Sequence, residues 1–369
     1  MTIAPGVTAS LTSEILPRAR VLAMPEYHPP LGNRDRLRLD FNENTLACSP
    51  AVKAALEKIS AADLTRYPER EPVEGLAASY LGLRSDQVIL TNGVDEAINV
   101  LCQAFLDRED ELLLPVPTYT MYEIYASATD ATLRKVQAGA DFQFPFESLM
   151  NAINAKTRMI AIANPNSPTG SVATREQILA IANAAPRAVI LVDEAYYHFY
   201  GESVIDLVGK IPNLVVARTF SKAYGLAGVR LGLLAGPESL LRWVRRVLSP
   251  YSVNSIALVA LTSALMDQSY LDWYVDQVKK ARAEFLSGLT ILGLHYWPTE
   301  ANFVLVDIGQ AHREFVTAIR EQGILVRDRS ADPGCDGCVR ITIGTSEQMR
   351  NALTAVEAFV KSNPSGVSK

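Results

Sequence analysis

The chain has 369 residues, with 35 lysines and arginines against 40 aspartates and glutamates and a net charge of −5. This length exceeds one simple core and suits a large domain with a smaller companion, while the 49% hydrophobic and 20% charged shares are typical of a globular enzyme. Because the sequence contains neither an extended basic block nor a run of about 18 apolar residues, nucleic-acid binding has little support and no membrane span is expected.

The N-terminal residues and the cysteines bear on the cellular compartment. The N-terminal segment lacks the apolar core of a secretory signal, so we expect a cytoplasmic protein. Cys335 and Cys338 form a single C-x-x-C pair. A metal site would need a second ligand pair at matching spacing, and the sequence offers none. The pair is therefore expected to be a turn with two reduced thiols, with a redox role as the alternative.

Strand and helix patterns alternate through the first two thirds of the chain. Residues 1–40 are rich in proline and arginine and are expected to form an extended arm. The short apolar runs that follow fit strands buried on both faces, as in a mainly parallel sheet covered by helices, and predict a doubly wound α/β domain. The expected strands are Gln87–Leu90, Glu111–Leu114, Met159–Ala163, Ala188–Val192 and Leu214–Arg218, with helices at Asp95–Leu106 and Tyr119–Ala128.

The pattern changes near Pro250. Long helical stretches followed by short strands predict a smaller α+β domain that the N-terminal arm completes. We expect an arm over residues 1–47, a large domain over 48–249 and a small domain over 250–369. The elements expected in the last of these are helices Ser255–Met266, Tyr270–Gly288 and Glu347–Lys361 and strands Phe303–Val306, Ile324–Val326 and Val339–Ile343.

Two polar segments follow the first strands of the large domain. Asn92-Gly93 makes a turn into a helix whose first amides would suit a phosphate. The simpler alternative is a turn with Asp95 near the helix cap. Tyr119 leaves the next strand where its ring could stack on a planar ligand, although Tyr119 or Tyr122 could equally pack the helix.

Two further segments end later strands. Asn164–Gly170 holds two prolines and a glycine, so it predicts a rigid polar turn at the sheet edge, where α/β proteins bind ligands. Asp193 ends a buried apolar strand, where a carboxylate is costly without a cationic partner. A protonated pyridine nitrogen would be such a partner, and Tyr196 could reach the phenolic oxygen of the same ring. A structural salt bridge or a helix cap is the alternative for Asp193.

The run from Thr219 to Gly232 is the most informative segment. Lys222 could form a Schiff base with an aldehyde, while the Ser221 hydroxyl and Arg230 hold a phosphate. Taken alone, Lys222 could be a solvent-facing loop lysine. Together with Asp193, however, this segment indicates an enzyme that uses pyridoxal phosphate (PLP).

On these residues the chain resembles the class I/II aminotransferases, PLP enzymes of fold type I. It is most similar to the subfamily typified by histidinol-phosphate aminotransferase, over about residues 25–360. The segments that carry the resemblance are Leu39–Asn44, Arg66–Glu69, Asn166–Gly170, Asp193–Tyr196, Ser221-Lys222 and Val339–Thr345.

The resemblance implies a role for each cofactor-binding position. Lys222 would bind the cofactor covalently and later move the proton, Asp193 would pair with the pyridine nitrogen, and Tyr196 would contact the ring oxygen, as would Asn166 or Ser167. The remaining contacts would be ring stacking by Tyr119, phosphate binding by the amides of Val94 and Asp95 and by Thr219, Ser221 and Arg230, and a phosphate contact from Tyr67 of a neighbouring subunit. Tyr67 therefore implies a homodimer with shared sites.

The resemblance also implies substrate contacts. Arg340 would clamp the α-carboxylate of the substrate, and Arg327 would help bind the substrate's own phosphate. Tyr27 in the N-terminal arm and Asn44 would be the remaining substrate contacts. The chain departs from the family pattern at Thr45, where proline is usual, at Val94, where serine is common, and at Ser167, where many relatives have asparagine.

The expected reaction is PLP-dependent transamination of L-histidinol phosphate with 2-oxoglutarate, in histidine biosynthesis. The alternatives are an aromatic amino-acid aminotransferase and a PLP-dependent decarboxylase of a phosphorylated amino acid. A non-enzymatic ligand-binding module is disfavoured because the lysine, aspartate, tyrosine and arginine set is intact. A nucleotide-dependent oxidoreductase is disfavoured because no G-x-G-x-x-G follows the first expected strand.

Overall fold

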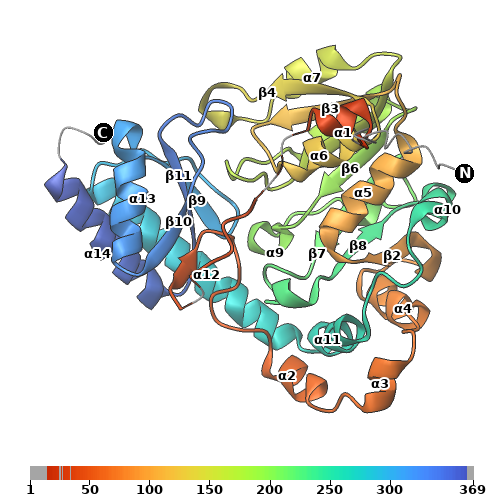
Figure 1. Ribbon diagram of the computed structural model, residues 1–369, viewed down its shortest axis with the longest axis horizontal. Helices are drawn as coiled ribbons and strands as arrows, with labels where there is room; N and C mark the ends of the chain where they lie inside the picture. The colour runs from red at the N-terminus through yellow and green to blue at the C-terminus, as the bar shows by residue number, and fades with distance from the viewer. Residues whose placement is uncertain (1–14, 25, 27, 34, 364–369) are drawn as a thin grey trace, which may run out of the picture.

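The computed structural model describes residues 15–24, 26, 28–33 and 35–363. Two sheets organise this part of the chain, and Figure 1 shows them as neighbouring lobes, with the long helix α12 (Gln268–Ile291) running from one to the other. The strands are β1 Leu37–Leu39, β2 Val88–Thr91, β3 Glu111–Val116, β4 Thr132–Gln137, β5 Thr157–Ala163, β6 Val189–Asp193, β7 Leu214–Thr219, β8 Gly232–Ala235, β9 Phe303–Asp307, β10 Ile324–Asp328 and β11 Cys338–Thr342.

Helices cover both sheets (Figure 1). They are α1 Ala19–Leu22, α2 Pro50–Leu56, α3 Ala61–Thr65, α4 Glu71–Tyr80, α5 Gly93–Phe105, α6 Met121–Ala128, α7 Phe146–Ala152, α8 Arg175–Ala184, α9 Tyr197–Tyr200, α10 Glu238–Val247, α11 Ser255–Met266, α12, α13 His312–Glu321 and α14 Ser346–Ser362.

The larger sheet has seven strands in the order β2-β8-β7-β6-β5-β3-β4. Its central strands β7, β6, β5 and β3 run parallel, whereas β8 is antiparallel to both of its neighbours. β6 and β7 are buried along their whole length, so apolar side chains on both faces pack beneath helices. The expected α/β class with a mainly parallel sheet is confirmed.

The smaller sheet has the order β1-β10-β11-β9, with β1 parallel to β10 and the other pairs antiparallel. Because side chains alternate along a strand, its two faces differ. Val306 and Val339 point into the main hydrophobic core. Arg327 and Arg340 are cross-strand partners and lie on the opposite face.

The structure corrects several expected boundaries and adds elements. The helix expected from Tyr119 begins at Met121, and Gln87 belongs to a 3₁₀ turn before β2. The strands that were not expected are β1, β4 and β8: β4 is a largely exposed edge strand with a polar sequence, and β1 and β8 are only three and four residues long. The division at residues 249 and 250 stays a prediction; α11, just after it, packs on α2 and α4.

Candidate active site

The carboxyl ends of β5, β6 and β7 form one edge at which the polar segments meet. Asp193 is the last residue of β6, and its carbonyl accepts from the amide of Asn164 at 2.8 Å. Glu194 donates its backbone N–H to the carbonyl of Ala217 on β7 at 2.9 Å. The three strand ends are thereby held in register, and the side chains that follow them share one edge of the sheet.

Asp193 is a buried carboxylate held by neutral donors. The Tyr122 hydroxyl donates to Oδ2 at 2.6 Å, and the Ala195 amide donates to Oδ1 at 3.0 Å. Among the described residues no cation pairs with it. Burial raises the pKa of Asp193 to about 6, and the two hydrogen bonds oppose this rise. The site therefore favours a cationic partner for this carboxylate.

Lys222 and Tyr196 lie together next to the segment that follows β1. The Lys222 ammonium donates to the carbonyl of Phe41 at 2.8 Å and lies 6.0 Å from the centre of the Tyr196 ring. The side-chain amide of Asn42 donates to the Tyr196 hydroxyl at 2.9 Å. Asn42 has φ of 55°, a left-handed conformation that asparagine tolerates. Residues 41 and 42 thus connect the lysine and the tyrosine.

The start of α5 forms the candidate phosphate cup. Arg230 pairs with Asp95 at 2.9 Å, and the Tyr119 hydroxyl donates to the other oxygen of Asp95 at 2.7 Å. Gly93 has φ of +75°, and a Cβ there would lie 2.7 Å from the Arg230 guanidinium. A side chain at Gly93 would therefore displace the arginine. The amides of Val94 and Asp95 open the helix at this point.

Thr219 and Ser221, the other expected phosphate contacts, lie at the carboxyl end of β7. Thr219 ends β7, and its hydroxyl accepts from the amide of Ser221 at 3.1 Å. Both side chains are buried. The hydroxyls are therefore fixed immediately before Lys222, where the sequence places the phosphate contacts.

Asn166 and Ser167 take different partners. The Asn166 amide donates to the carbonyl of Pro117 and to Thr169, and its oxygen accepts from Thr118. Ser167 accepts from the Arg340 guanidinium at 2.9 Å. Asn166 is thus engaged within the turn, and Ser167 faces the arginine. A contact of either side chain with the cofactor ring stays a prediction.

Arg340 is buried and reaches back toward the lysine. It donates to the carbonyl of Asp40 at 2.6 Å, one residue before the carbonyl that Lys222 contacts. Arg327 lies opposite on β10, 5.7 Å from the centre of the Phe41 ring, and makes no hydrogen bond or ion pair with other described residues. Two guanidinium groups therefore lie next to Lys222 without carboxylate partners.

The remaining expected residues lie at the margin of the site. Asn44 donates to the carbonyl of Ala223 at 3.3 Å, beside Lys222. Tyr67 is 77% exposed and stacks on Tyr251 with 4.3 Å between the ring centres. Tyr27 lies outside the described residues. Substrate contacts of Asn44 and Tyr27 and a cofactor contact of Tyr67 stay predictions.

Comparison with known proteins decides the family. The model of the family "Aminotransferase class I and II" matches residues 34–356. The chain belongs to the class I and II aminotransferases. It is 35% identical over 342 residues to a histidinol-phosphate aminotransferase from Geobacillus sp. (strain WCH70), covering 89% of this chain and 92% of that protein. It is 33% identical over 336 residues to histidinol-phosphate aminotransferase 2 from Legionella pneumophila (strain Lens), covering 89% and 91%.

A solved structure of such an aminotransferase has the same fold. The histidinol-phosphate aminotransferase of Sinorhizobium meliloti, solved in complex with pyridoxal-5'-phosphate, matches with a TM-score of 0.87 and 24% identity. The match covers 96% of this chain and 100% of that one. The expectation of the fold type I aminotransferase architecture is confirmed.

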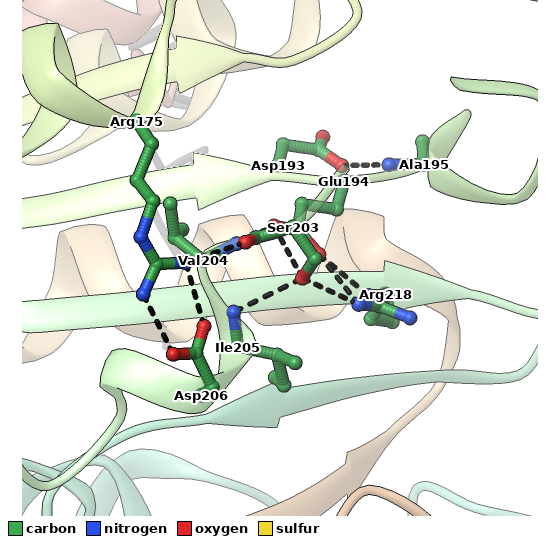
Figure 2. A network of polar contacts seen from close by, with 9 residues as sticks. All are labelled: Arg175, Asp193, Glu194, Ala195, Ser203, Val204, Ile205, Asp206 and Arg218. Atoms are coloured by element: carbon green, nitrogen blue, oxygen red, sulfur yellow. Dashed lines mark hydrogen bonds and ion pairs between the residues drawn. The ribbon is translucent and has the colours of Figure 1, made fainter. Parts of the chain in front are cut away.

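Four residues at or beside this aminotransferase site were given no role from the sequence. Tyr122, weighed above as a helix-packing residue, contacts Asp193. Glu194 and Arg218 form a buried ion pair at 2.7 Å beside it, and Ser203 bonds to both (Figure 2). Arg218 lies in a strand that was expected to be buried, and a buried arginine needs a carboxylate as its counter-ion. The sequence therefore contained a signal for an ion pair at this position.

The last features to consider are metal binding, membrane spanning and the two cysteines. In the described ranges no group of three histidine, cysteine or acidic side chains could hold a metal ion, and no helix could cross a membrane. Cys335 and Cys338 are buried free thiols; Cys335 lies in the turn before β11, and Cys338 is the first residue of that strand. Hydrogen bonding between the two thiols and burial raise the pKa of Cys338 far above its usual range. The expected turn with two reduced thiols is consistent with this arrangement.

Proposed function

We propose that this aminotransferase uses pyridoxal 5'-phosphate to transfer the amino group of L-histidinol phosphate to 2-oxoglutarate. The observation that carries the proposal is the pair Arg327 and Arg340, two guanidinium groups without carboxylate partners next to Lys222. Together they supply two positive charges, which match a phosphate dianion at one end of an amino donor.

The residues present fit the cofactor. Asp193 is fully enclosed and has neutral donors only, so a protonated pyridine nitrogen would supply the missing positive charge. The hydroxyls of Thr219 and Ser221, the first amides of α5 and Arg230 would hold the phosphate. Tyr119 at the rim would stack on the ring, and Tyr196 would meet its oxygen.

The chain's own groups then account for the proton chemistry. When bound, the cofactor withdraws electrons from the amino carbon of the substrate. The Lys222 amine, 6.0 Å from the centre of the Tyr196 ring, would be the base that takes up the proton from that carbon and later gives it back. Asn42 holds the Tyr196 hydroxyl in place. The Asp193 carboxylate would favour the protonated form of the ring nitrogen.

The same arginines accept both substrates in turn. L-Histidinol phosphate has a phosphate and no carboxylate, so Arg327 and Arg340 bind its phosphate. 2-Oxoglutarate has two carboxylates, and Arg340 would bind the one next to its keto group in a forked geometry. Because the guanidinium groups lie side by side across two strands, one site can receive either anion.

A homodimer in the cytoplasm completes the proposal. Tyr67 and Tyr251 form an exposed aromatic pair, and Leu64 on α3 is 64% exposed beside it in the sequence. Apolar surface of this kind supports contact with a second copy of the chain. In such a dimer Tyr67 would reach the cofactor phosphate of the partner subunit.

The test is a half-reaction with the PLP-loaded protein. The visible absorbance band is followed after separate additions of L-histidinol phosphate, phenylalanine and tyrosine. Fast loss of the band with L-histidinol phosphate alone is expected. Loss mainly with the aromatic amino acids would instead make the protein an aromatic aminotransferase. The Lys222→Ala variant is the control and should show no conversion with any donor.

A further inference from the structure

Three arginines line up on one face of the small sheet, the face that meets the catalytic lysine. Arg327 and Arg340 are direct partners across β10 and β11. Arg329 follows two residues after Arg327, and its amide donates to the carbonyl of Cys338 at 2.9 Å, two residues before Arg340. The pairing therefore continues past the end of β10, and alternation along the strand places Arg329 on the same face.

A fourth arginine joins them from β1. Arg38 pairs with Leu325, two residues before Arg327, and both arginines approach the ring of Phe41, at 4.9 Å and 5.7 Å. The face thus carries four positive charges within one sheet. Such a concentration is costly unless counter-ions are present.

Three carboxylates neutralise part of this charge. Asp40 pairs with Arg38 at 3.0 Å, the more exposed Glu43 lies 3.6 Å from the same guanidinium, and Asp332 pairs with Arg329 across one turn of the loop after β10. In the described part of the chain no carboxylate pairs with Arg327 or Arg340. Two arginine–aspartate pairs therefore stand beside two arginines that retain their full charge.

Hydrogen bonding on this face is also incomplete. Nine buried side-chain nitrogen or oxygen atoms among the described residues have no hydrogen-bond partner, and five of them lie here. Two of the five, an Asp332 oxygen and the Arg38 Nε, still have ion-pair contacts with Arg329 and Glu43. The Nε atoms of Arg329 and Arg340 and one carboxylate oxygen of Asp40 have neither kind of contact. Buried polar atoms are normally satisfied, so this concentration indicates that a polar ligand or bound water completes the site.

We propose that the Arg329–Asp332 pair sets the charge of this anion-binding face and so determines its preference for a phosphate dianion over a carboxylate. With Asp332 bound to Arg329, the two remaining arginines match a dianion in charge. The Nε–H of Arg329 stays available as an additional donor toward the phosphate or its water. The inference rests on the proposed function, and it names residues that select the donor.

Two single substitutions should act in opposite directions. In Arg329→Gln, Asp332 loses its partner and neutralises Arg327 or Arg340 instead, so the KM for L-histidinol phosphate should rise roughly tenfold, against about twofold for glutamate. In Asp332→Asn, Arg329 adds a third unpaired charge, so the KM for L-histidinol phosphate should fall about threefold. The double variant should return close to the original value.

Inorganic phosphate supplies a second readout that does not depend on the donor. Its inhibition constant against glutamate, measured on the PLP-loaded dimer, should rise in Arg329→Gln and fall in Asp332→Asn. Arg350→Gln on α14, an exposed arginine of the same lobe, is the matched control and should change neither value. Thermal unfolding of each variant shows that it is folded.

The outcomes separate the two proposals. If both single variants shift KM for both donors in the same direction, or if phosphate inhibition is unchanged, the pair is structural and the inference is overturned. If the unchanged protein converts no L-histidinol phosphate, the proposed donor is wrong. Opposite shifts in phosphate inhibition would still establish the charge-setting role in that case.

Discussion

The edge of the large sheet and the face of the small sheet are incomplete in opposite ways. At the end of β6 a buried carboxylate, Asp193, has neutral donors and, among the described residues, no cation. On the small sheet two guanidinium groups, Arg327 and Arg340, have no carboxylate partner in the same part of the chain. Since burying an unpaired charge is costly, each region retains a charge that a ligand of opposite sign would stabilise.

The ion pair Glu194–Arg218 shows how a buried charge is neutralised elsewhere in the same molecule. Glu194 is adjacent to Asp193 and equally buried, yet it accepts from Arg218, Ser203 and the amide of Val204 (Figure 2). The two neighbouring carboxylates therefore differ in role because their hydrogen-bond and ion-pair partners differ. Glu194 holds β6 and β7 together, and Asp193 remains free to bind a cation.

Substituting the unpaired carboxylate should have the largest effect. Asp193→Asn keeps the shape of the side chain and removes its charge, so the ring nitrogen would lose its partner. We expect kcat/KM to fall at least about 100-fold, with little change in the free energy of unfolding of the loaded protein. Steady-state kinetics and chemical denaturation measure the two. A variant with near-normal kcat/KM would contradict the role of Asp193.

Breaking the complete pair should instead cost stability. Glu194→Gln leaves Arg218 buried without a counter-ion, so the free energy of unfolding should fall by about 3 kcal/mol. Chemical denaturation at neutral pH measures the loss. The control is Arg175→Gln, which removes a more exposed ion pair with Asp206 nearby and should cost less than about 1 kcal/mol. Equal losses in the two variants would show that burial of the pair is unimportant.

The pH dependence of the cofactor-free protein should reveal the unpaired carboxylate. Burial raises the pKa of Asp193 from 3.8 to about 6, so its contribution to stability is full below pH 4 and is lost as the pH rises through 6. At 1.36 kcal/mol per pKa unit the loss amounts to about 3 kcal/mol at most.

Denaturation of the cofactor-free protein from pH 4 to 7, compared with Asp193→Asn, measures this contribution. The variant lacks the ionisable group, so the difference in unfolding free energy between the two proteins should change with pH. Loading with PLP should weaken the dependence, because a cation lowers the pKa of Asp193. A constant difference across this range would mean that Asp193 is not an isolated buried acid.

The smallest expected effect concerns the unpaired cations. Arg327→Ala should raise the KM for L-histidinol phosphate about tenfold and leave phenylalanine less affected, because only the phosphate uses both arginines. Parallel kinetics with the two donors measure the difference. An equal loss for both donors would remove Arg327 as the phosphate-binding residue.

Much of the chemistry was predictable from local sequence. Asp193 follows an apolar run and Lys222 lies among small and hydroxyl side chains, so their types and positions indicate a cofactor site. The central strands were found because both of their faces are apolar, whereas β4 is polar and largely exposed, and β8, although apolar and buried, is only four residues long. Tyr122 could not be assigned, because its contact with Asp193 depends on how α6 packs over the sheet.

Residue types and short-range spacing were enough to predict the α/β class, the order of the polar strand ends and the aminotransferase residues. They did not predict which charges are paired. Glu194 and Arg218 are far apart in the chain and meet only because β6 pairs with β7, and the Arg340 guanidinium reaches the backbone carbonyl of Asp40 only because β1, β10 and β11 share one sheet. Pairing is a property of distance and burial in space, which spacing along the chain does not encode.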